Sequence, residues 1–288
     1  MSKRLSIIIV TYNSEKLIFD CLDSIYKYND IGNGLEIVIV DNCSDDRDSV
    51  FAKIRSDYPA DIILIKSAVN KGYGAGNNQG VQIANAPVFI VMNPDVRLVE
   101  PIFKKLLSKF ECNPKIGLIG VNFTDGSNNL HLKPEYANWS KMLLFHLYHK
   151  FGWFKIEQMY FSGSFLVFDK QSFIDAGSFD ENLFLFYEEA DISNRILAIE
   201  KETILAKDIF VLHLMHGRDV NLYLLKIGAE SRKYYFKKYN ADLNQYYTYL
   251  LIKYNIKHII AIILNNKIRK ADYKGWIEIC NNYKFKTK

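Results

Sequence analysis

Three carboxylates follow an aromatic run in the second half of the chain. Glu188, Glu189 and Asp191 come directly after L-F-L-F-Y at residues 183–187. A carboxyl group that is held among aromatic side chains loses solvation, and this loss raises its pKa towards the value that a general base needs. Acids also stabilise the first turn of a helix through the helix dipole, and such capping is the structural alternative. The cluster is a candidate catalytic site.

A second candidate site lies where an apolar run stops. V-F-I-V-M at residues 88–92 passes directly into Asn93, Pro94 and Asp95. Proline cannot donate to a β-ladder, so we expect the strand to end here. Mg²⁺ and Mn²⁺ prefer oxygen ligands, and a cation that also binds a diphosphate needs only one or two protein carboxylates. Asp95 is therefore a candidate metal ligand, and Asn93 is a candidate for steadying a ribose or the turn.

Polar residues also follow two earlier strand-like runs. The first run of the chain ends in Thr11, Tyr12 and Asn13, and the second ends in Asp41. In open α/β sheets, ligands bind at the edge formed by the carboxyl ends of the strands. Asp41 can accept a hydrogen bond from a base imide or a ribose hydroxyl, and we expect Thr11 to lie near the same nucleoside.

The segment N-K-G-Y-G-A-G-N-N at residues 70–78 is rich in glycine. Glycine allows a backbone to approach a ligand closely, so Asn70, Gly72 and Asn77 are candidate nucleotide-binding residues. The dinucleotide fingerprint, however, places its glycines directly after the first strand, where this chain reads V-T-Y-N-S. A dinucleotide-dependent oxidoreductase is therefore a poor fit, and a surface turn is the structural alternative.

Two histidines lie three residues apart after a late apolar run. V-L-H-L-M-H places them at His213 and His216. A single histidine is usually structural, but a pair with this spacing can hold a metal or a phosphate.

The elements that must position these residues alternate along the chain. Apolar strand-like runs are separated by stretches of helical length, and a helix is expected from Ser14 to about Tyr28. This alternation is typical of a parallel sheet covered on both faces. The sequence predicts the α/β class, with a mostly parallel central sheet flanked by helices and a helical C-terminal extension. The strand-like runs are 5–11, 35–41, 62–66, 86–92, 115–121 and 161–168.

The composition is that of a folded protein that needs no membrane span. The chain has 288 residues, of which 49% are hydrophobic and 24% are charged. It has no apolar run of about eighteen residues, and the apolar run near its start is too short for a targeting signal. Its four cysteines form no C-x-x-C pair, which disfavours a zinc site and a disulfide framework and fits a reducing cytoplasm.

The charge is concentrated at the end of the chain. Residues 226–288 hold fourteen Lys and Arg against four acids, whereas the whole chain carries a net charge of +5. Tyrosines are interleaved with these basic residues. Such a segment suits an anionic membrane surface, where basic and aromatic side chains lie at headgroup level, and a solvated basic helix is the structural alternative. No nucleic-acid recognition motif is present, so we expect no nucleic-acid partner.

These motifs together resemble those of family-2 glycosyltransferases with the A-type nucleotide-binding fold. The matching segments lie between about residues 5 and 217 and are V-T-Y-N, V-D-N-C-S-D-D, N-K-G-Y-G-A-G-N-N, N-P-D, G-S-F-L-V and F-D-E-N-L-F-L-F-Y-E-E-A-D-I-S-N-R. N-P-D in place of the commoner D-x-D, together with H-x-x-H, is similar to the pattern of bacterial rhamnosyltransferases of O-antigen and cell-wall polysaccharide assembly.

The resemblance implies a role for each candidate residue. The donor would be bound by Thr11, Tyr12, Asn13, Asp41, Asn70, Gly72, Asn77, Asn93 and Asp95. Asp95 would also bind the metal, Mg²⁺ or Mn²⁺, with His213 or His216 close to it. Gly163 and Ser164 would line the acceptor and sugar pocket.

The catalytic base departs from the family pattern. The usual E-D pair reads Glu188-Glu189 here, and Glu189 falls where the family has its catalytic aspartate. One extra methylene moves the carboxylate by about 1 Å, and a misplacement of that size can cost about a hundredfold in rate. Either the pocket compensates, or Glu188 or Asp191 serves instead.

The resemblance also implies a reaction and its setting. The expected activity is inverting, metal-dependent transfer of a hexose from a dTDP- or UDP-linked donor to a hydroxyl of a glycan or a polyprenol-diphosphate-linked acceptor. dTDP-L-rhamnose is the favoured donor. The alternatives are galactofuranose, a UDP-hexose, or a non-catalytic nucleotide-sugar-binding protein. The expected location is the cytoplasm, peripheral at the inner face of the cytoplasmic membrane, in lipopolysaccharide or related polysaccharide synthesis.

This function suggests a division of the chain into three parts. Residues 1–120 would form the nucleotide-sugar-binding half of the main domain. Residues 121–225 would form its acceptor-binding and catalytic half, including a loop and helix over the site at about 122–158. Residues 226–288 would form the basic, aromatic helical extension.

Overall fold

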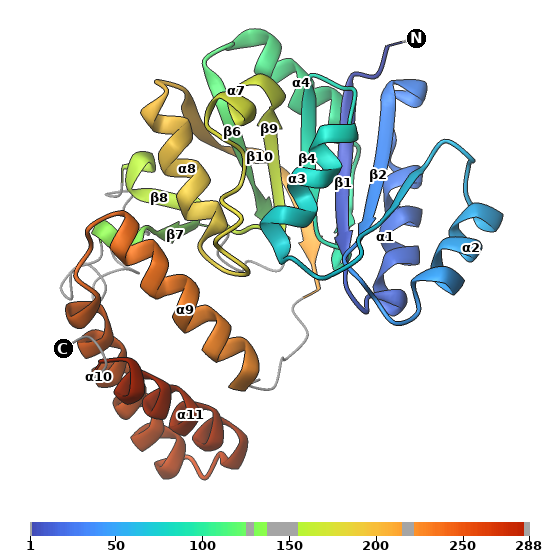
Figure 1. Cartoon of the computed structure of the whole chain (residues 1–288). Coiled ribbons are helices and arrows are strands. Elements are labelled where there is room, and N and C mark those ends of the chain that lie inside the picture. Colours follow the sequence, from blue (N-terminus) through green and yellow to red (C-terminus); the bar gives the residue numbers. More distant parts are fainter. Residues whose placement is uncertain (1, 125–129, 137–154, 215–221, 285–288) are drawn as a thin grey trace. The chain divides into compact units, whose positions relative to one another are not determined.

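The computed structural model describes residues 2–124, 130–136, 155–214 and 222–284 (Figure 1). The strands are β1 (Leu5–Thr11), β2 (Leu35–Asp41), β3 (Ile63–Lys66), β4 (Val88–Met92), β5 (Val96–Leu98), β6 (Ile116–Phe123), β7 (Leu130–Leu132), β8 (Met159–Phe161), β9 (Phe165–Asp169) and β10 (Glu202–His213). The helices are α1 (Glu15–Lys27), α2 (Arg47–Asp57), α3 (Tyr73–Ile83), α4 (Phe103–Cys112), α7 (Lys170–Asp175), α8 (Glu188–Ala198), α9 (Leu222–Lys238), α10 (Leu243–Ile263) and α11 (Lys267–Lys284).

The chain divides into two compact units. The first consists of Met1–His131, Met159–Phe184 and Glu188–Met215, and the second of Leu132–Gln158, Leu185–Tyr187 and His216–Lys288. The expected boundaries at residues 120 and 225 concern function rather than compactness, and they stay a prediction. The loop and helix expected at 122–158 fall largely on residues outside the described ranges.

The first unit is built on one large sheet, as the alternating pattern predicts. Its strand order is β3-β2-β1-β4-β9-β6-β10-β5. β1 pairs in parallel with both β2 and β4, so the carboxyl ends of these strands lie at the same edge of the sheet. β6 and β10 are also parallel to each other. The α/β class and the mostly parallel sheet flanked by helices are confirmed.

Two strands run against their neighbours. β9 pairs antiparallel with both β4 and β6, and β5 pairs antiparallel with β10. The run expected at 161–168 is broken into β8 and β9. An apolar run shows that a strand is buried on both faces but carries no information about its direction, so these pairings could not be read from the sequence.

Both faces of the sheet are covered, which explains why its central strands β1, β2 and β4 are mostly apolar. On one face, Ile7, Ile37 and Ile90 belong to a core that also includes the buried faces of α1, α2 and α4. On the other face, α3 lies so close to the sheet that a Cβ at Gly80 would meet Ile8 at 2.4 Å. Strands with two buried faces bury apolar residues on alternating sides, and Ile and Val, which favour extended backbone, suit this role.

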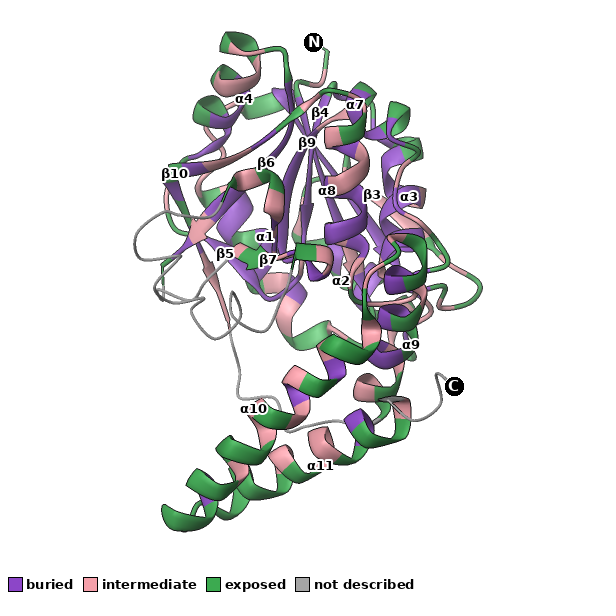
Figure 2. Cartoon of the chain, turned by 90° about the vertical axis from the view of Figure 1, so that its left-hand side faces the viewer, coloured by how far each residue is buried: buried purple, intermediate pink, exposed green. Residues whose placement is uncertain are grey.

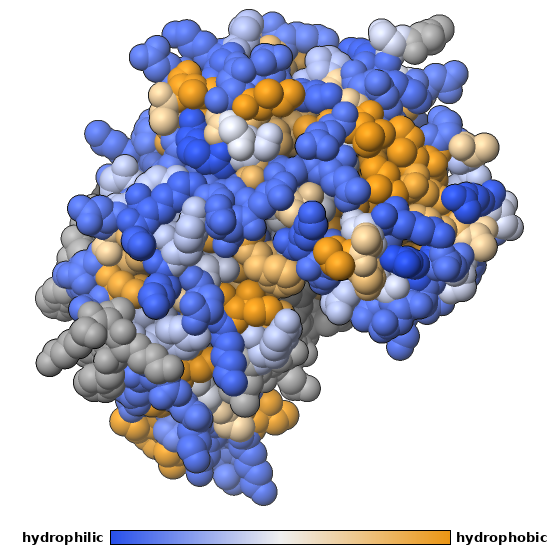
Figure 3. Space-filling model, in the orientation of Figure 1, coloured by the Kyte–Doolittle hydropathy of each residue, from blue (hydrophilic) through white to orange (hydrophobic). Residues whose placement is uncertain are grey.

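The second unit contains the helical extension. α10 and α11 follow each other through a short connection and pack along their length, with Tyr254 stacked on Trp276 at 4.9 Å between ring centroids. Tyr247, Leu250 and Cys280 are buried between the helices. The outer surface of this hairpin is exposed, and hydrophobic side chains lie on it (Figures 2 and 3). Among the helices that the structure describes, none has the length and hydrophobicity needed to cross a bilayer.

α9 holds the short segment 185–187 within the second unit. The Ser231 hydroxyl donates to the Leu185 carbonyl at 2.7 Å, and Arg232 Nε donates to the Tyr187 hydroxyl at 2.8 Å. Phe186 and Tyr187 both adopt positive φ angles, 75° and 76°, which are unfavourable for side chains with a Cβ. These contacts stabilise a strained backbone immediately before the first residue of α8.

Candidate functional site

The ends of β1 and β2 are joined through a buried carboxylate. The Thr11 hydroxyl donates to Asp41 Oδ2 at 3.1 Å, and the Ser44 amide donates to Asp41 Oδ1 at 2.8 Å. Thr11 lies opposite Asp41 in the parallel register, and both residues are buried. Asp41 therefore shapes the loop after β2 in addition to the ligand-binding role expected for it.

The loop after β1 is held against the loop after β2. Asn13 adopts a left-handed backbone with φ of 48°, its amide donates to Ser44 Oγ at 2.8 Å, and its Oδ1 accepts from the Asp45 amide at 3.1 Å. Asparagine tolerates this conformation better than most residues. The neighbouring Tyr12 is 53% exposed, so its ring is available to a ligand at this edge.

The glycine-rich segment is tied to the loop after β2 by a residue that sequence reasoning missed. Asn42 Nδ2 donates to Asn70 Oδ1 at 2.8 Å and to the Gly72 carbonyl at 3.0 Å. Gly72 has φ of 92°, and a Cβ there would lie 2.2 Å from the Phe184 carbonyl oxygen, so glycine is required. The Gly72 amide donates to Asn70 Oδ1, and the Tyr73 amide donates to the Phe184 carbonyl. Both amides are therefore paired within the protein.

Asn77 lies one turn inside α3 and is almost fully buried. Its Nδ2 donates to the Tyr73 carbonyl at 2.9 Å. Its Oδ1 has no hydrogen-bond partner among the described residues. Burying an amide oxygen without a partner costs free energy, so this atom is available to a polar group of a ligand or a water.

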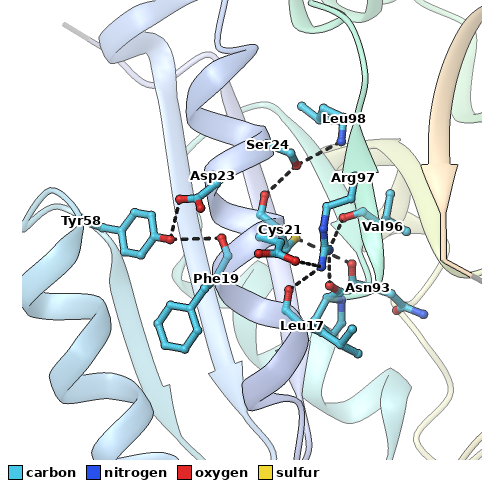
Figure 4. Close-up of polar contacts among 12 residues, drawn as sticks. Leu17, Phe19, Cys21, Asp23, Ser24, Tyr58, Asn93, Val96, Arg97 and Leu98 are labelled. Atoms are coloured by element: carbon cyan, nitrogen blue, oxygen red, sulfur yellow. Dashed lines mark hydrogen bonds and ion pairs between the residues drawn. The ribbon is translucent and has the colours of Figure 1, made fainter.

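A buried arginine, Arg97, donates hydrogen bonds to the N-P-D turn, and the sequence did not predict this contact. Arg97 donates to the Pro94 carbonyl at 2.6 Å and, across to α1, to the Leu17 carbonyl at 2.9 Å (Figure 4). On the same side, the Cys21 thiol contacts the Asn93 carbonyl at 3.9 Å. Because the guanidinium has five donors in a fixed fork, it can fix several carbonyls at once.

Asp95 and His213 lie side by side. β5 pairs with the end of β10, with Val96 opposite His213, and the Leu214 amide donates to the Asp95 carbonyl at 2.9 Å. His213 Nε2 is 3.4 Å from Asp95 Oδ2, and His213 Nδ1 has no hydrogen-bond partner among the described residues. His216 lies outside the described residues.

This pair fits a cation that takes most of its ligands from a substrate. A carboxylate and an imidazole are both accepted by Mn²⁺, and the carboxylate suits Mg²⁺. In the described ranges no group of three or more His, Cys, Asp and Glu side chains could hold a metal alone. Two protein ligands at a strand edge are, however, what a diphosphate-bound cation requires.

Gly163 and Glu189 make the closest contact of the acid cluster. The Gly163 amide donates to Glu189 Oε1 at 3.0 Å. A Cβ on Gly163 would lie 2.3 Å from the same oxygen, so any larger residue would displace the carboxylate. The next residue, Ser164, is buried, and its carbonyl accepts from the Asn93 amide at 2.9 Å. The segment before β9 thus links the N-P-D turn to the acid cluster.

The two adjacent glutamates have different surroundings. Burial raises the pKa of Glu188 well above its usual value, and the neighbouring charge of Glu189 raises it further. Glu188 Oε1 has no hydrogen-bond partner among the described residues. Burial also raises the pKa of Glu189, but the Gly163 amide stabilises its charged form. A proton on this pair therefore favours Glu188, and Glu189 is left as the carboxylate that can accept one.

Asp191 is committed to an ion pair on the same helix. Arg195 donates to Asp191 Oδ2 through Nε at 2.9 Å and through a terminal nitrogen at 2.7 Å. The Arg195 guanidinium also donates to the Ala176 carbonyl, so this contact attaches α8 to the end of α7. Asp191 is fully buried, and its Oδ2 is occupied by the two hydrogen bonds from Arg195.

Tyr73 connects the acid cluster to the metal-binding candidate. Its hydroxyl donates to the Gly163 carbonyl at 2.5 Å. Burial raises the pKa of Tyr73 well above its usual value, and the carboxylates of Glu189, Glu188 and Asp95 raise it further. The charges of Asp95 and Glu189 thus both affect the pKa of Tyr73, although the two residues are separated by more than ninety positions in the chain. Nothing in the sequence marked Tyr73, because its role depends on a contact with a distant loop.

Comparisons with solved structures show a similar fold in other proteins, one of which is a mannosyltransferase. The chain aligns with the mannosyltransferase PcManGT from Pyrobaculum calidifontis, in complex with GDP-Man and Mn²⁺, over 100% of its length and 89% of that protein, with a TM-score of 0.66 and 15% identity. It aligns with residues 1–349 of TarS from S. aureus, in complex with UDP, over 99% of its length and 92% of that chain, with a TM-score of 0.56 and 15% identity.

The sequence comparisons point in the same direction. A poly(ribitol-phosphate) beta-glucosyltransferase from Bacillus spizizenii is 29% identical over 93 residues, which are 32% of this chain and 15% of that protein. The chain thus matches only a small part of this relative's length. The model of the family described as glycosyl transferase family 2 matches residues 6–177, which is more than half of the chain and includes β1, β2, β4 and β9. The chain therefore belongs to glycosyl transferase family 2, and its fold is the A-type glycosyltransferase fold.

Proposed function

We propose that the chain moves a sugar from a nucleoside diphosphate donor to a hydroxyl of an acceptor, with inversion at the anomeric carbon. The observation that carries this proposal is that the segment before β9 contacts both groups: the Gly163 amide donates to Glu189 Oε1, and the Ser164 carbonyl accepts from the Asn93 amide, two residues before Asp95. A base and a metal-binding pair at one sheet edge are what a single displacement at a sugar diphosphate requires.

The nucleoside would lie over the ends of β1 and β2. The exposed ring of Tyr12 and the loop that carries Asn13 flank this region, and Asp41 and Thr11 form its floor. The ribose and diphosphate would extend towards Asn93 and Asp95. GDP-Man and UDP are bound by the two structurally similar proteins described above, which supports a nucleotide-linked donor here.

Glu189 would act as the general base. Its Oε1 accepts from the Gly163 amide, which leaves the second oxygen to accept the proton of the acceptor hydroxyl. The acceptor oxygen attacks the anomeric carbon from the side opposite the diphosphate, the bond from that carbon to the diphosphate oxygen breaks, and the nucleoside diphosphate leaves with the electron pair. Glu188, which retains its proton, would not compete for this role.

Asp95 and His213 would hold a divalent cation together with the diphosphate of the donor. A cation in this place supplies positive charge that stabilises the departing diphosphate. Arg97 fixes the turn that carries Asp95, so the carboxylate needs little rearrangement when the donor binds. Mn²⁺ in the structurally similar mannosyltransferase supports this assignment.

We further propose dTDP-L-rhamnose as the donor, and a glycan or a polyprenol-diphosphate-linked chain at the inner face of the cytoplasmic membrane as the acceptor. The N-P-D and H-x-x-H patterns support rhamnose, and the basic extension supports an acceptor at a membrane. UDP-hexoses and galactofuranose are the competing donors, because uridine and thymidine present the same imide edge to Asp41.

A panel of nucleotide sugars tests this proposal. Purified protein is mixed with dTDP-rhamnose, UDP-glucose, UDP-galactofuranose and GDP-mannose, with Mn²⁺, Mg²⁺ or a chelator, and donor binding and slow donor hydrolysis are measured. We expect one nucleotide class to bind with metal dependence and to be hydrolysed. The Glu189→Gln variant should bind the same donor without hydrolysing it. Metal-dependent binding with no turnover by the unaltered protein would instead support a non-catalytic nucleotide-sugar-binding protein.

A further inference from the structure

The end of the α10–α11 hairpin exposes a cluster of large aliphatic side chains. Six of them, Ile256, Ile259, Ile260, Ile263, Leu264 and Ile268, are between 48% and 75% exposed. They lie on the second half of α10, on the connection to α11 and on its first turn. We call residues 252–270 the hairpin tip. Single exposed aliphatic residues are common, but a contiguous group of this size usually marks an interaction surface.

The aliphatic residues of α10 form a continuous stripe on one face. Ile252, Ile256, Ile259 and Ile263 follow one another at intervals of four, three and four residues, which places them on the same side of a helix. On the opposite face, Leu250 and Ala261 are buried. Packing against α11 therefore uses one face of α10 and leaves the isoleucine stripe uncovered within the second unit.

The hairpin tip is strongly basic. Residues 252–270 contain five Lys and Arg and no Asp or Glu. Lys257, Lys267, Arg269 and Lys270 are exposed. Exposed isoleucines flanked by exposed cations are typical of helices that lie at a membrane interface, where the aliphatic face enters the acyl boundary and the cations remain among the headgroups.

We propose that the hairpin tip docks on an anionic lipid surface by inserting its isoleucine stripe at headgroup depth. A second copy of this chain would bring two surfaces with five cations and no acids against each other, and this repulsion disfavours self-association. An anionic bilayer offers the complementary charge and an apolar layer at the same place. Neither helix of the hairpin is long and apolar enough to cross a membrane, so docking would be at the surface. The inference rests on the proposed membrane location but not on the identity of the donor.

Vesicle flotation with the full chain tests the role of the isoleucines. The triple variant Ile256→Gln, Ile259→Gln, Ile263→Gln removes the stripe and leaves the buried face unchanged. The matched control Ile83→Gln, Ile174→Gln removes two comparably exposed isoleucines of the first unit. With vesicles that contain 30% phosphatidylglycerol by design at physiological salt, we expect the triple variant to bind at least about tenfold more weakly than the unaltered protein. The control should bind as the unaltered protein does.

A second variant separates charge from insertion. Lys257→Gln, Lys267→Gln, Lys270→Gln should weaken binding to anionic vesicles and reduce its dependence on salt. If the isoleucine variant binds as tightly as the unaltered protein, the hairpin tip is held on the vesicles by charge alone, and the insertion proposal is overturned. If the isoleucine variant instead converts a dimer to a monomer in analytical ultracentrifugation and the unaltered protein ignores vesicles, the stripe binds a second copy and the proposal is also overturned.

Donor hydrolysis is measured on the same preparations. Loss of vesicle binding with unchanged donor hydrolysis and an unchanged circular dichroism spectrum supports the proposal. Vesicle binding that depends on the isoleucines, in a protein that hydrolyses no nucleotide sugar, would leave the docking surface standing and overturn the proposed transferase activity. The two failures are therefore distinguishable.

Discussion

The two ends of the same sheet edge differ in how their polar groups are partnered. At the ends of β1 and β2, Asp41 accepts from Thr11 and Ser44, and Asn13 is bonded to the next loop through its amide and its side chain. At the start of α8 and the end of β10, Glu188 Oε1 and His213 Nδ1 are buried without a hydrogen-bond partner among the described residues.

This difference separates what stabilises the fold from what is available for chemistry. Paired polar groups keep the loops after β1 and β2 in place before any ligand arrives. Buried polar atoms that lack partners cost stability, and they are tolerated where a substrate or cation can complete them. We therefore expect substitutions at the two ends to differ in kind, with losses of activity at one and losses of stability at the other.

The largest effect is expected from Glu189→Gln. Removing the proposed base while keeping the shape of its side chain should lower transfer by about 10²- to 10⁴-fold, with donor affinity nearly unchanged. Rates with saturating donor and acceptor, together with donor dissociation constants, measure both. Glu188→Gln is the matched control, because it alters the adjacent carboxyl that retains its proton, and its loss should be much smaller. Equal losses for the two variants would contradict the assignment of the base.

The next effect is expected from Gly163→Ala. Its Cβ would lie 2.3 Å from Glu189 Oε1, so the carboxylate must move, and a displacement of about 1 Å can cost about a hundredfold in rate. Gly34→Ala is the control, since its Cβ would meet only the flexible side chain of Arg4 at 3.4 Å. A Gly163→Ala enzyme with normal kcat would show that Glu189 does not need the observed position.

A smaller effect is expected when Asp95 and His213, the proposed metal-binding pair, are altered. Loss of a residue that only hydrogen-bonds to a metal ligand typically lowers metal affinity by about 10- to 100-fold. Asp95→Ala removes a proposed ligand itself, so metal-dependent donor binding should weaken by at least about 10- to 100-fold. His213→Gln should have a similar but weaker effect. Titration calorimetry with and without a chelator measures the metal-dependent part of donor affinity. Donor binding that stays metal-dependent in Asp95→Ala would place the cation elsewhere.

The pH dependence of stability tests the buried state of Glu188. Folding raises the pKa of this carboxyl above its usual value of 4.5, so the folded state binds the proton more tightly than the unfolded state. Its contribution to stability is therefore complete below about pH 4.5 and falls as the pH rises towards the raised pKa, by up to about 1.4 kcal/mol per pH unit. Urea unfolding of Glu188→Gln should lack this decline. A parallel decline in both proteins would assign it to another group.

The smallest effect on activity, and a clear effect on stability, is expected from Thr11→Val. The variant removes the hydroxyl that donates to Asp41 Oδ2 and leaves a buried carboxylate oxygen without it. The free energy of unfolding should fall by about 1–3 kcal/mol, while kcat changes little. Ser56→Ala on α2 is a suitable control, because Ser56 is exposed and its hydroxyl makes no hydrogen bond in the part of the chain that the structure describes. A large fall in kcat with an unchanged free energy of unfolding would contradict the expected difference between the two ends of the sheet edge.

Much of this architecture could be predicted from the sequence, because it depends on local patterns. β1 and β2 have the expected boundaries, and the polar residues after β1, β2 and β4 meet at one edge because those strands are parallel neighbours. The direction of β9 and the clamp of Arg97 on the N-P-D turn could not be predicted. Both depend on contacts between residues that are far apart in the chain, and no local pattern encodes such contacts.

The reversed direction of β9 has a consequence for how such enzymes can diversify. In an all-parallel sheet, the segment in front of a strand opens on the opposite edge from the ligand. Because β9 runs the other way, its leading segment reaches the same edge as the segments that trail β1, β2 and β4. Under the proposed function, changes in the one segment that precedes Phe165 can alter which acceptor is used. The strands that bind the nucleoside need not change.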